Sequence, residues 1–274
     1  MYYKNMETKS ILDHEKLKQI AKEKSSVYQN AKPFSHVVID HLFDDRILDV
    51  VLKDFPTVTS INWTKFKTPM ENNKFASDKY ELIPDNIRYV LDQLNSATFI
   101  NFLEELTGIK GLIADPHYVG GGMHQTVRGG SLGIHVDFNK HSLFNLYRRI
   151  NVLLYLNKDW KEEWGGSLEL WDHKVQKCYE KVLPVYNRLA IFTTSEGSQH
   201  GYPDPLTCPK EETRKSLAWY YYTVDKPDNI DGELHTTIYT KRPGKDSNYS
   251  MQKVKDFLRE LTPPIIYKIY LKLK

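Results

Sequence analysis

The sequence predicts an α+β chain that is mainly β, with helices placed before a strand-rich core. Up to about residue 112, apolar residues recur at helical spacing between polar connectors. From about residue 113, short runs of β-branched and aromatic residues follow one another between glycine and proline clusters. Many short strands without intervening helices favour an antiparallel sandwich or barrel, which the preceding helices would brace.

Capping and periodicity predict the helices that precede the strands. Residues 11–21 place apolar side chains near helical spacing among lysines and glutamates, which is typical of an amphipathic helix. Residues 34–40 have the composition of a short strand that follows a polar connector. Asp44 is a suitable N-cap for a helix over residues 46–55, and a further helical stretch covers about residues 84–106.

Five further strands are predicted where β-branched and aromatic residues lie between turn clusters. They cover residues 134–138, 150–156, 167–171, 189–193 and 216–224. After Pro243 this pattern ends, and residues 251–261 have helical spacing. We expect three parts: a helical extension over 1–32, a main domain over 33–242 with its β core from about 113, and a helix with a basic aromatic tail over 243–274.

The composition is that of an ordinary soluble globular protein. Hydrophobic residues make up 40% and charged residues 27%, which excludes a disordered or fibrous chain. The net charge of +3 is too balanced to indicate a nucleic-acid partner. The two cysteines, Cys178 and Cys208, cannot form a disulfide framework or a cysteine zinc site. No apolar run approaches a membrane span and the start has no signal-peptide pattern, so we expect a cytoplasmic protein.

One tripeptide indicates a metal site. Of ten histidines, only His135 begins a His-X-Asp sequence, His135-Val136-Asp137, inside a predicted strand. Residues two apart on a strand share a face, so His135 and Asp137 can point to one ion, and His200 follows a later strand. Two histidines and one carboxylate form the facial triad of non-heme iron oxygenases. The tripeptide alone is weak evidence, because a strand histidine is often only a half-buried side chain.

Arg214 and Ser216 strengthen this interpretation. They open the last long predicted strand and share one of its faces. A guanidinium binds a carboxylate through two hydrogen bonds, and a neighbouring hydroxyl adds a donor. An iron site whose co-substrate is a dicarboxylate needs such a group, because a carboxylate inside a barrel must be neutralised. The order His-X-Asp, His, Arg-X-Ser is less compatible with the alternative of an exposed arginine at a strand edge.

With these residues, the chain resembles the iron and 2-oxoglutarate dependent dioxygenases, specifically the prolyl-hydroxylase-like group. The resemblance runs from about Phe34 to Lys241. It rests on the segments PFSHVVID (33–40), YLNKDW (155–160), WGGSLEL (164–170), NRLAIF (187–192) and SLAWYYY (216–222), which occur in the family's order. This resemblance implies a double-stranded β-helix, a jelly-roll relative, with Fe(II) near one mouth of the barrel.

The resemblance also implies roles for individual residues. It assigns His135, Asp137 and His200 to Fe(II), and Arg214 to the distal carboxylate of 2-oxoglutarate. Tyr155 and Ser216 would contact the same carboxylate.

The chain departs from the family upstream of His-X-Asp. Many prolyl hydroxylases have a tyrosine there that holds the co-substrate, whereas this chain reads Gly120-Gly121-Gly122-Met123-His124-Gln125. Either Gln125 or Tyr118 would take that role. This glycine-rich loop also leaves the substrate open between a prolyl or other peptide side chain and a small molecule or sugar unit.

The implied reaction is hydroxylation of a C–H bond with O2, which converts 2-oxoglutarate to succinate and CO2. Related halogenases lack the carboxylate ligand, so Asp137 indicates hydroxylation. The resemblance adds ascorbate (vitamin C) as a candidate reductant. Candidates for the substrate wall lie on or beside the metal-bearing strands: Asn139, Arg128, Arg149 and Trp171. For Trp171 a packing role is favoured.

Two other classes of function remain open from the residues. A zinc hydrolase could use two histidines, one aspartate and a water. A non-catalytic cupin-like binding module could keep the barrel, although it would not need both the triad and the arginine.

The C-terminal tail, residues 262–274, interleaves apolar and aromatic residues with lysines and has no acidic residue. This pattern fits a segment at an anionic membrane surface or on a partner. Packing of the tail on the protein itself, with its lysines in water, is the favoured interpretation.

Overall fold

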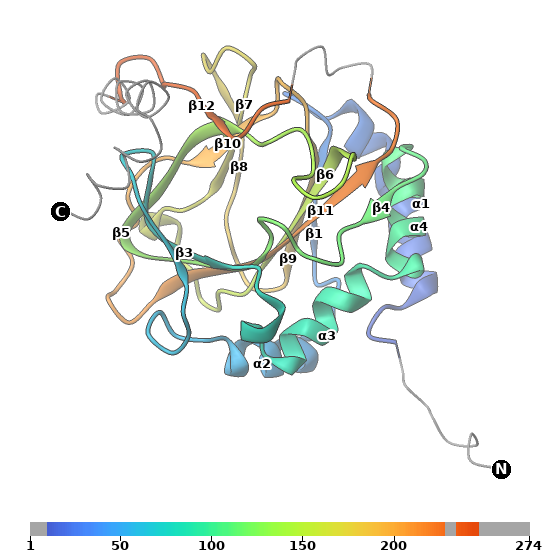
Figure 1. Ribbon diagram of the computed structural model, residues 1–274, viewed down its shortest axis with the longest axis horizontal. Coiled ribbons are helices and arrows are strands. Elements are labelled where there is room, and N and C mark those ends of the chain that lie inside the picture. The colour runs from blue at the N-terminus through green and yellow to red at the C-terminus, as the bar shows by residue number, and fades with distance from the viewer. Residues whose placement is uncertain (1–9, 228–233, 247–274) are drawn as a thin grey trace.

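The computed structural model describes residues 10–227 and 234–246, and four helices lie on the outside of a strongly bent sheet (Figure 1). They are α1 (His14–Asn30), α2 (Asp45–Asp54), α3 (Asp85–Leu94) and α4 (Ala97–Thr107). Asp13 and Asp44 cap α1 and α2, because each side chain accepts a hydrogen bond from a backbone N–H of the first turn. The predicted helix over 251–261 and the tail over 262–274 lie outside the described residues.

Two helical predictions differ from the structure. The helix predicted over residues 11–21 continues to Asn30, because Tyr28 is buried and its hydroxyl lies 2.6 Å from Thr193 Oγ1. The stretch predicted over 84–106 is two helices, α3 and α4. They separate at Asn95, whose side-chain amide donates a hydrogen bond of 3.0 Å to the carbonyl of Asp115. Both differences come from contacts with residues far away in the sequence.

The sheet contains twelve strands, and every pairing in it is antiparallel. The strands are β1 (His36–Asp40), β2 (Thr64–Lys67), β3 (Glu71–Ser77), β4 (Ile113–Ala114), β5 (Gly122–Val136), β6 (Tyr147–Tyr155), β7 (Leu168–Trp171), β8 (Cys178–Val182), β9 (Arg188–Thr193), β10 (Gln199–Tyr202), β11 (Thr213–Thr223) and β12 (Ile238–Tyr239). Their main order is β1-β9-β6-β11-β5-β10-β7-β8, and β3 and β12 also pair with β5. The predicted α+β, mainly β class with an antiparallel β core is confirmed.

Alternation along the strands separates the core from the site. On β11, Leu217, Trp219 and Tyr221 pack into the large apolar core that the helices share. Ser216 and Tyr220 point to the opposite face and line a cavity inside the barrel. Successive side chains of a strand point to opposite faces, so one strand serves both the core and the site.

The sequence did not reveal all strands. β2, β3, β4, β8, β10 and β12 were not predicted, and β5 is fifteen residues long although only its C-terminal end was expected. Among residues 10–227 and 234–246, no helix combines the length and apolar character needed to cross a membrane.

Candidate active site

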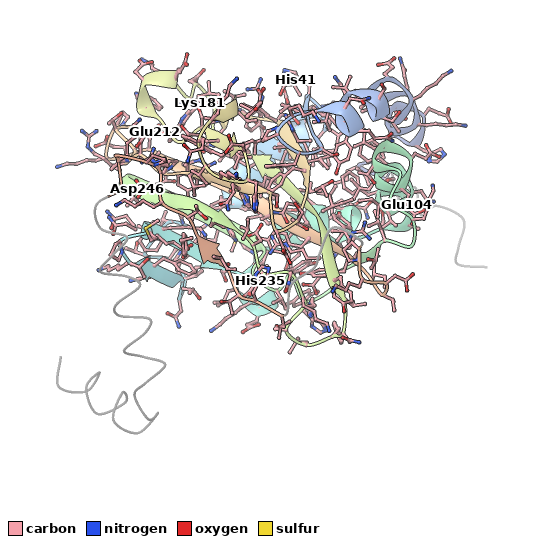
Figure 2. The ribbon with its side chains drawn as sticks, turned by 90° about the horizontal axis from the view of Figure 1, so that it is seen from above. His41, Glu104, Lys181, Glu212, His235 and Asp246 are labelled. Atoms are coloured by element: carbon pink, nitrogen blue, oxygen red, sulfur yellow. The ribbon has the colours of Figure 1, made fainter. Side chains whose placement is uncertain are left out.

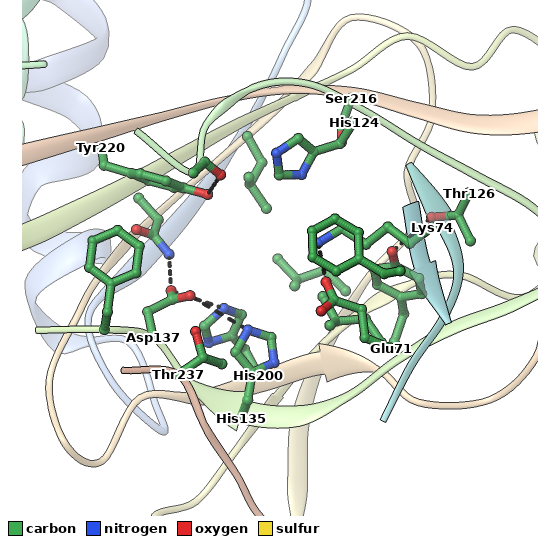
Figure 3. Close-up of a pocket in the computed structure, with 18 of the residues that line it drawn as sticks. Glu71, Lys74, His124, Thr126, His135, Asp137, His200, Ser216, Tyr220 and Thr237 are labelled. Carbon is green, nitrogen blue, oxygen red and sulfur yellow. Dashed lines mark hydrogen bonds and ion pairs between the residues drawn. The ribbon is translucent and has the colours of Figure 1, made fainter. Parts of the chain in front are cut away.

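A cavity of about 210 Å³ opens inside the barrel, and several buried polar side chains line it (Figure 3). Its walls come from β5, β6, β9, β10 and β11, and side chains of β3 and β12 close its rim. His135, Asp137 and His200 lie on one side of it, and Arg214 and Ser216 also line it.

His135, Asp137 and His200 converge on one point. His135 near the end of β5 faces His200 of β10 directly across the two strands. His135 Nε2 lies 3.5 Å from Asp137 Oδ1, and His200 Nε2 lies 3.3 Å from Asp137 Oδ2. One ligand atom from each side chain falls within 4.8 Å of the others, so the three could hold a metal ion.

The hydrogen bonds of the two imidazoles determine where their lone pairs point. The Nδ1 atoms of His135 and His200 each lie 2.8 Å from a backbone carbonyl, of Gly133 and Ser198 respectively. A carbonyl only accepts, so each Nδ1 carries a proton, and each ring turns its Nε2 toward Asp137. Burial lowers the pKa of His200 to about 4, which keeps that ring neutral near pH 7.

Asp137 is held as a carboxylate by its surroundings. Burial opposes its ionisation, but the nearby Arg148 guanidinium holds its pKa well below the usual range. Asn151 Nδ2 donates a hydrogen bond of 2.6 Å to Asp137 Oδ2. Two imidazole nitrogens and a carboxylate therefore lie close together, an arrangement that a shared metal cation would stabilise.

Arg148 is the basic residue beside Asp137. Its Nε donates to Asn151 Oδ1 at 2.8 Å, and its Nη2 lies 3.2 Å from Asp137 Oδ2. The guanidinium stacks between Phe138 and Tyr220, with its central carbon 4.3 and 3.4 Å from the two ring centroids. Among the described residues, neither Nη atom has an acceptor in hydrogen-bond geometry.

Arg214 lies inside the cavity. Its Nε donates a hydrogen bond of 2.7 Å to the carbonyl of Gly166, and its Nη2 lies 3.4 Å from the hydroxyl of Tyr155. The guanidinium carbon is 4.1 Å from the ring centroid of Tyr202. Ser216 is one strand repeat away on the same face of β11, so the structure brings Arg214, Tyr155 and Ser216 together.

Gly166 leaves the space that the side chain of Arg214 occupies, because a glycine has no Cβ. Its φ is +76°, and a Cβ there would lie 2.6 Å from Leu206 Cδ2 and 3.0 Å from Arg214 Cδ. We expect Gly166→Ala to destabilise the protein by about 1–3 kcal/mol beyond the backbone strain, through overpacking. Gly165→Ala is the matched control, because Gly165 has a similar φ of +72° and open space at its Cβ. Equal unfolding free energies of the two variants in urea would contradict this prediction.

Neither Gln125 nor Tyr118 lines the cavity. Gln125 points to the outside of the barrel, where its amide donates to the carbonyl of Pro56 at 2.9 Å and its Oε1 accepts from Thr213 at 3.2 Å. The hydroxyl of Tyr118 donates to Asp92 of α3. His124 and Thr126 of β5 face the cavity instead. Leu132 lines the cavity with the same parity as His124 and Thr126, and the alternation changes between Leu132 and His135, where the pairing with β10 is irregular.

Three of the four predicted substrate-wall residues lie elsewhere. Arg128 donates to the carbonyls of Thr207 and Cys208, Arg149 donates to Thr223 Oγ1, and the indole of Trp171 donates to Glu169. None of these three lines the cavity. The prediction chose Arg149, whereas the neighbouring Arg148 points inward.

Asn139 is the fourth predicted substrate-wall residue. It is buried and lines a small recess next to Asp137 and Arg148. Its Oδ1 accepts a hydrogen bond of 3.1 Å from the backbone N–H of His235.

Three residues that were not predicted also line the cavity, Glu71 and Lys74 of β3 and Tyr239 of β12. Lys74 Nζ lies 2.6 Å from Glu71 Oε1, and the hydroxyl of Tyr239 donates to Glu71 Oε2 at 3.1 Å. The ring of Tyr239 lies 5.5 Å from that of His135. The segment Glu71–Ser77, ENNKFAS, has little β propensity, so no local signal marks it as a strand beside the site.

Two buried histidines make the stability of the metal-free protein depend on pH. Burial lowers the pKa of His124 to about 3 and that of His200 to about 4. In the unfolded chain both protonate near pH 6.5, so below this pH the unfolded state binds more protons. As the pH drops from about 6.5 toward 4, each of the two histidines should lower the free energy of unfolding by up to about 1.4 kcal/mol per pH unit.

Urea unfolding in the presence of a chelator measures this slope. His124→Gln should remove about half of it, because only His200 then keeps its depressed pKa. A free energy of unfolding that stays constant between pH 7 and 5 would contradict the prediction.

Comparison with known proteins agrees with this geometry. Residues 121–222 match the family model of the 2OG-Fe(II) oxygenase superfamily. The mouse protein Prolyl 3-hydroxylase OGFOD1 is 30% identical over 79 residues, which are 27% of this chain and 14% of the mouse protein.

Solved structures show the same fold. A prolyl 4-hydroxylase from Phytophthora capsici superposes with a TM-score of 0.54 at 19% identity, covering 84% of this chain and 70% of that one. HygX from Streptomyces hygroscopicus, with nickel, 2-oxoglutarate and hygromycin B bound, gives 0.52 at 10% identity, covering 78% and 96%. The predicted jelly-roll core is confirmed by these structures, and the match of residues 121–222 to the family model confirms the resemblance to iron and 2-oxoglutarate dependent oxygenases.

Proposed function

We propose that this chain, whose residues 121–222 match the 2OG-Fe(II) oxygenase superfamily, hydroxylates a C–H bond of a peptide or small-molecule substrate with O2 and 2-oxoglutarate. One observation carries the proposal. Two imidazoles, each held by a backbone carbonyl at Nδ1, turn their Nε2 atoms toward an ionised carboxylate inside the cavity. Such a donor set suits a divalent transition metal and leaves coordination positions free on the cavity side.

His135, Asp137 and His200 would hold Fe(II). Their outer partners support this role: carbonyls orient the two imidazoles, and Asn151 and Arg148 orient the carboxylate. Bound iron with 2-oxoglutarate and O2 supplies the oxidant that replaces a C–H hydrogen by hydroxyl and yields succinate and CO2. The protein binds and orients the reactants and keeps bulk water away from them.

Arg214 would neutralise the distal carboxylate of 2-oxoglutarate. Its Nε is bonded to Gly166, which leaves the Nη atoms for the co-substrate, and Ser216 adds a hydroxyl in the cavity. Tyr155 does not line the cavity, but its hydroxyl lies 3.4 Å from Arg214 Nη2. Burial raises the pKa of Tyr155, so this phenol keeps its proton and can donate it in a hydrogen bond.

Arg148 would contact the substrate. Its aromatic neighbours hold the guanidinium in place. Apart from the ion pair of Nη2 with Asp137, its Nη atoms have no hydrogen-bond acceptor among the described residues. A buried cation of this kind favours a substrate with a carbonyl or carboxylate oxygen close to the reacting carbon. Both a peptide and a polyhydroxylated small molecule can offer such an oxygen, so both substrate classes are retained. The use of ascorbate and a cytoplasmic location stay predictions from the sequence.

Requirement for O2 separates this function from its alternatives. Purified protein with Fe(II), 2-oxoglutarate and a panel of peptides and aminoglycosides should release succinate in air and none under argon. A zinc hydrolase would act without O2 or 2-oxoglutarate, and a non-catalytic binding module would release no succinate under either condition. Either result would overturn the proposal.

A further inference from the structure

Lys74 and Arg214 occupy the same rung of the sheet. In the register, Lys74 of β3 and Arg214 of β11 both pair with Thr126 of β5, one from each side. Directly paired residues of an antiparallel sheet point to the same face, and all three side chains line the cavity. Two cations therefore flank one threonine at the same depth in the barrel.

Lys74 is buried and charged. Only 9% of the residue is exposed, and its ammonium lies 4.9 Å from the ring centroid of Phe66. Burial opposes the charge, but the carboxylate of Glu71 raises the pKa of Lys74 above its usual value. An ammonium has three N–H donors, and within residues 10–227 and 234–246 Glu71 is the one hydrogen-bond acceptor found for Lys74.

The surroundings of Lys74 overlap with those of Arg214. Burial, the charge of Lys74 and, to a smaller extent, that of Arg214 lower the pKa of His124 to about 3. The ring of Tyr202 packs against the guanidinium of Arg214, and its hydroxyl lies 2.8 Å from Thr126 Oγ1. Figure 3 shows Lys74, Thr126 and Glu71 together on the side of the cavity away from Asp137.

Arg214 alone provides an incomplete site for a carboxylate. Its Nε–H is used by the carbonyl of Gly166, so the guanidinium cannot present its Nε and Nη donors together to an anion. A buried carboxylate has about four lone-pair positions to satisfy. The free N–H groups of Lys74 offer additional charged donors on the other side of Thr126.

We propose that Lys74 is a second cation for the distal carboxylate of 2-oxoglutarate and that Glu71 competes with this carboxylate for it. The inference rests on the proposed function, since it concerns the same cavity. Glu71 is held in place by Tyr239 of β12, so its carboxylate shares its lone pairs between Lys74 and the phenol. Arrival of the co-substrate gives Lys74 a second anionic partner.

Calorimetric titration of the full chain loaded with Mn(II) tests this inference without turnover. Lys74→Met should weaken 2-oxoglutarate binding about tenfold, the loss expected for one charge-assisted hydrogen bond. Glu71→Gln should strengthen binding severalfold, because Lys74 loses its competing anion. 2-Oxopentanoate has the same chain length but no distal carboxylate, so neither substitution should change its affinity.

Three outcomes would overturn the inference. They are an unchanged 2-oxoglutarate affinity in Lys74→Met, equal losses for both ligands, or weaker 2-oxoglutarate binding in Glu71→Gln. Equal losses would mean a structural role, and the Mn(II) affinity of each variant reports on folding of the site. If the proposed function itself is wrong, the result is a different one: the wild-type protein would bind neither 2-oxoglutarate nor 2-oxopentanoate.

Discussion

Replacing His200 by alanine should abolish metal binding and 2-oxoglutarate turnover while leaving a folded protein. The imidazole supplies one of the three atoms that converge within 4.8 Å, and no other described side chain is placed to substitute for it in this cluster. We expect the affinity for Fe(II) to fall by more than about 100-fold, because loss of a direct ligand should exceed the 10- to 100-fold effect of losing an outer partner. Equilibrium dialysis with Fe(II) under argon measures the affinity.

His135→Ala should behave in the same way, because the two rings face each other across β5 and β10 with centroids 4.4 Å apart. His14→Ala is a suitable control, since His14 is exposed at the start of α1. Undiminished iron binding in either cavity variant would remove that residue from the metal site.

Replacing Arg214 by alanine should weaken 2-oxoglutarate binding while Fe(II) stays bound. Removing one partner of a buried charge pair costs about 2–5 kcal/mol, which corresponds to at least about 30-fold in affinity. Much of this cost comes from leaving a carboxylate unpaired inside the barrel. Titration of the metal-loaded variant with 2-oxoglutarate measures the change.

Arg188→Ala provides the control for a lost arginine. The guanidinium of Arg188 pairs with Asp40 at 2.7 Å and does not line the cavity, so its loss should leave 2-oxoglutarate affinity within about twofold, as expected for a pair outside the site. If Arg214→Ala binds 2-oxoglutarate like the wild type, the carboxylate is held elsewhere in the cavity.

The sequence predicts those site residues that lie on strands with strong local patterns. His135 and Asp137 share a face because they are two residues apart, and Arg214 and Ser216 share a face of β11 for the same reason. Their strands are rich in β-branched and aromatic residues, so both position and orientation follow from the chain itself. The same runs of β-branched and aromatic residues predicted the class of fold.

The residues that the sequence missed depend on pairing between distant segments. Lys74 reaches the cavity because β3 pairs with β5, and Tyr239 does so because β12 pairs with the end of β5. Neither β3 nor β12 has the apolar alternation of a typical strand. Gln125 was a wrong candidate because an irregularity between Leu132 and His135 changes the alternation along β5, so His124 faces the cavity and Gln125 does not.

Arg149 was predicted to line the cavity in place of its neighbour Arg148, because local alternation could not distinguish the two. The sequence contains two adjacent arginines on β6, and alternation requires that only one of them faces the cavity. The pattern alone did not identify which. Arg148 pairs with Tyr222 of β11, and the pairing is irregular between Tyr221 and Tyr222. This irregularity shifts the alternation of β6, so Arg148 faces the cavity and Arg149 does not.

A crystal structure of the protein, grown under argon with Fe(II) and 2-oxoglutarate, would locate both the metal and the co-substrate. We expect one iron, identified by its anomalous signal, bound to Nε2 of His135, an oxygen of Asp137 and Nε2 of His200. We also expect 2-oxoglutarate beside that iron, with its distal carboxylate next to Arg214. Iron bound at other residues, or 2-oxoglutarate bound away from Arg214, would show that this cavity is not the active site proposed here.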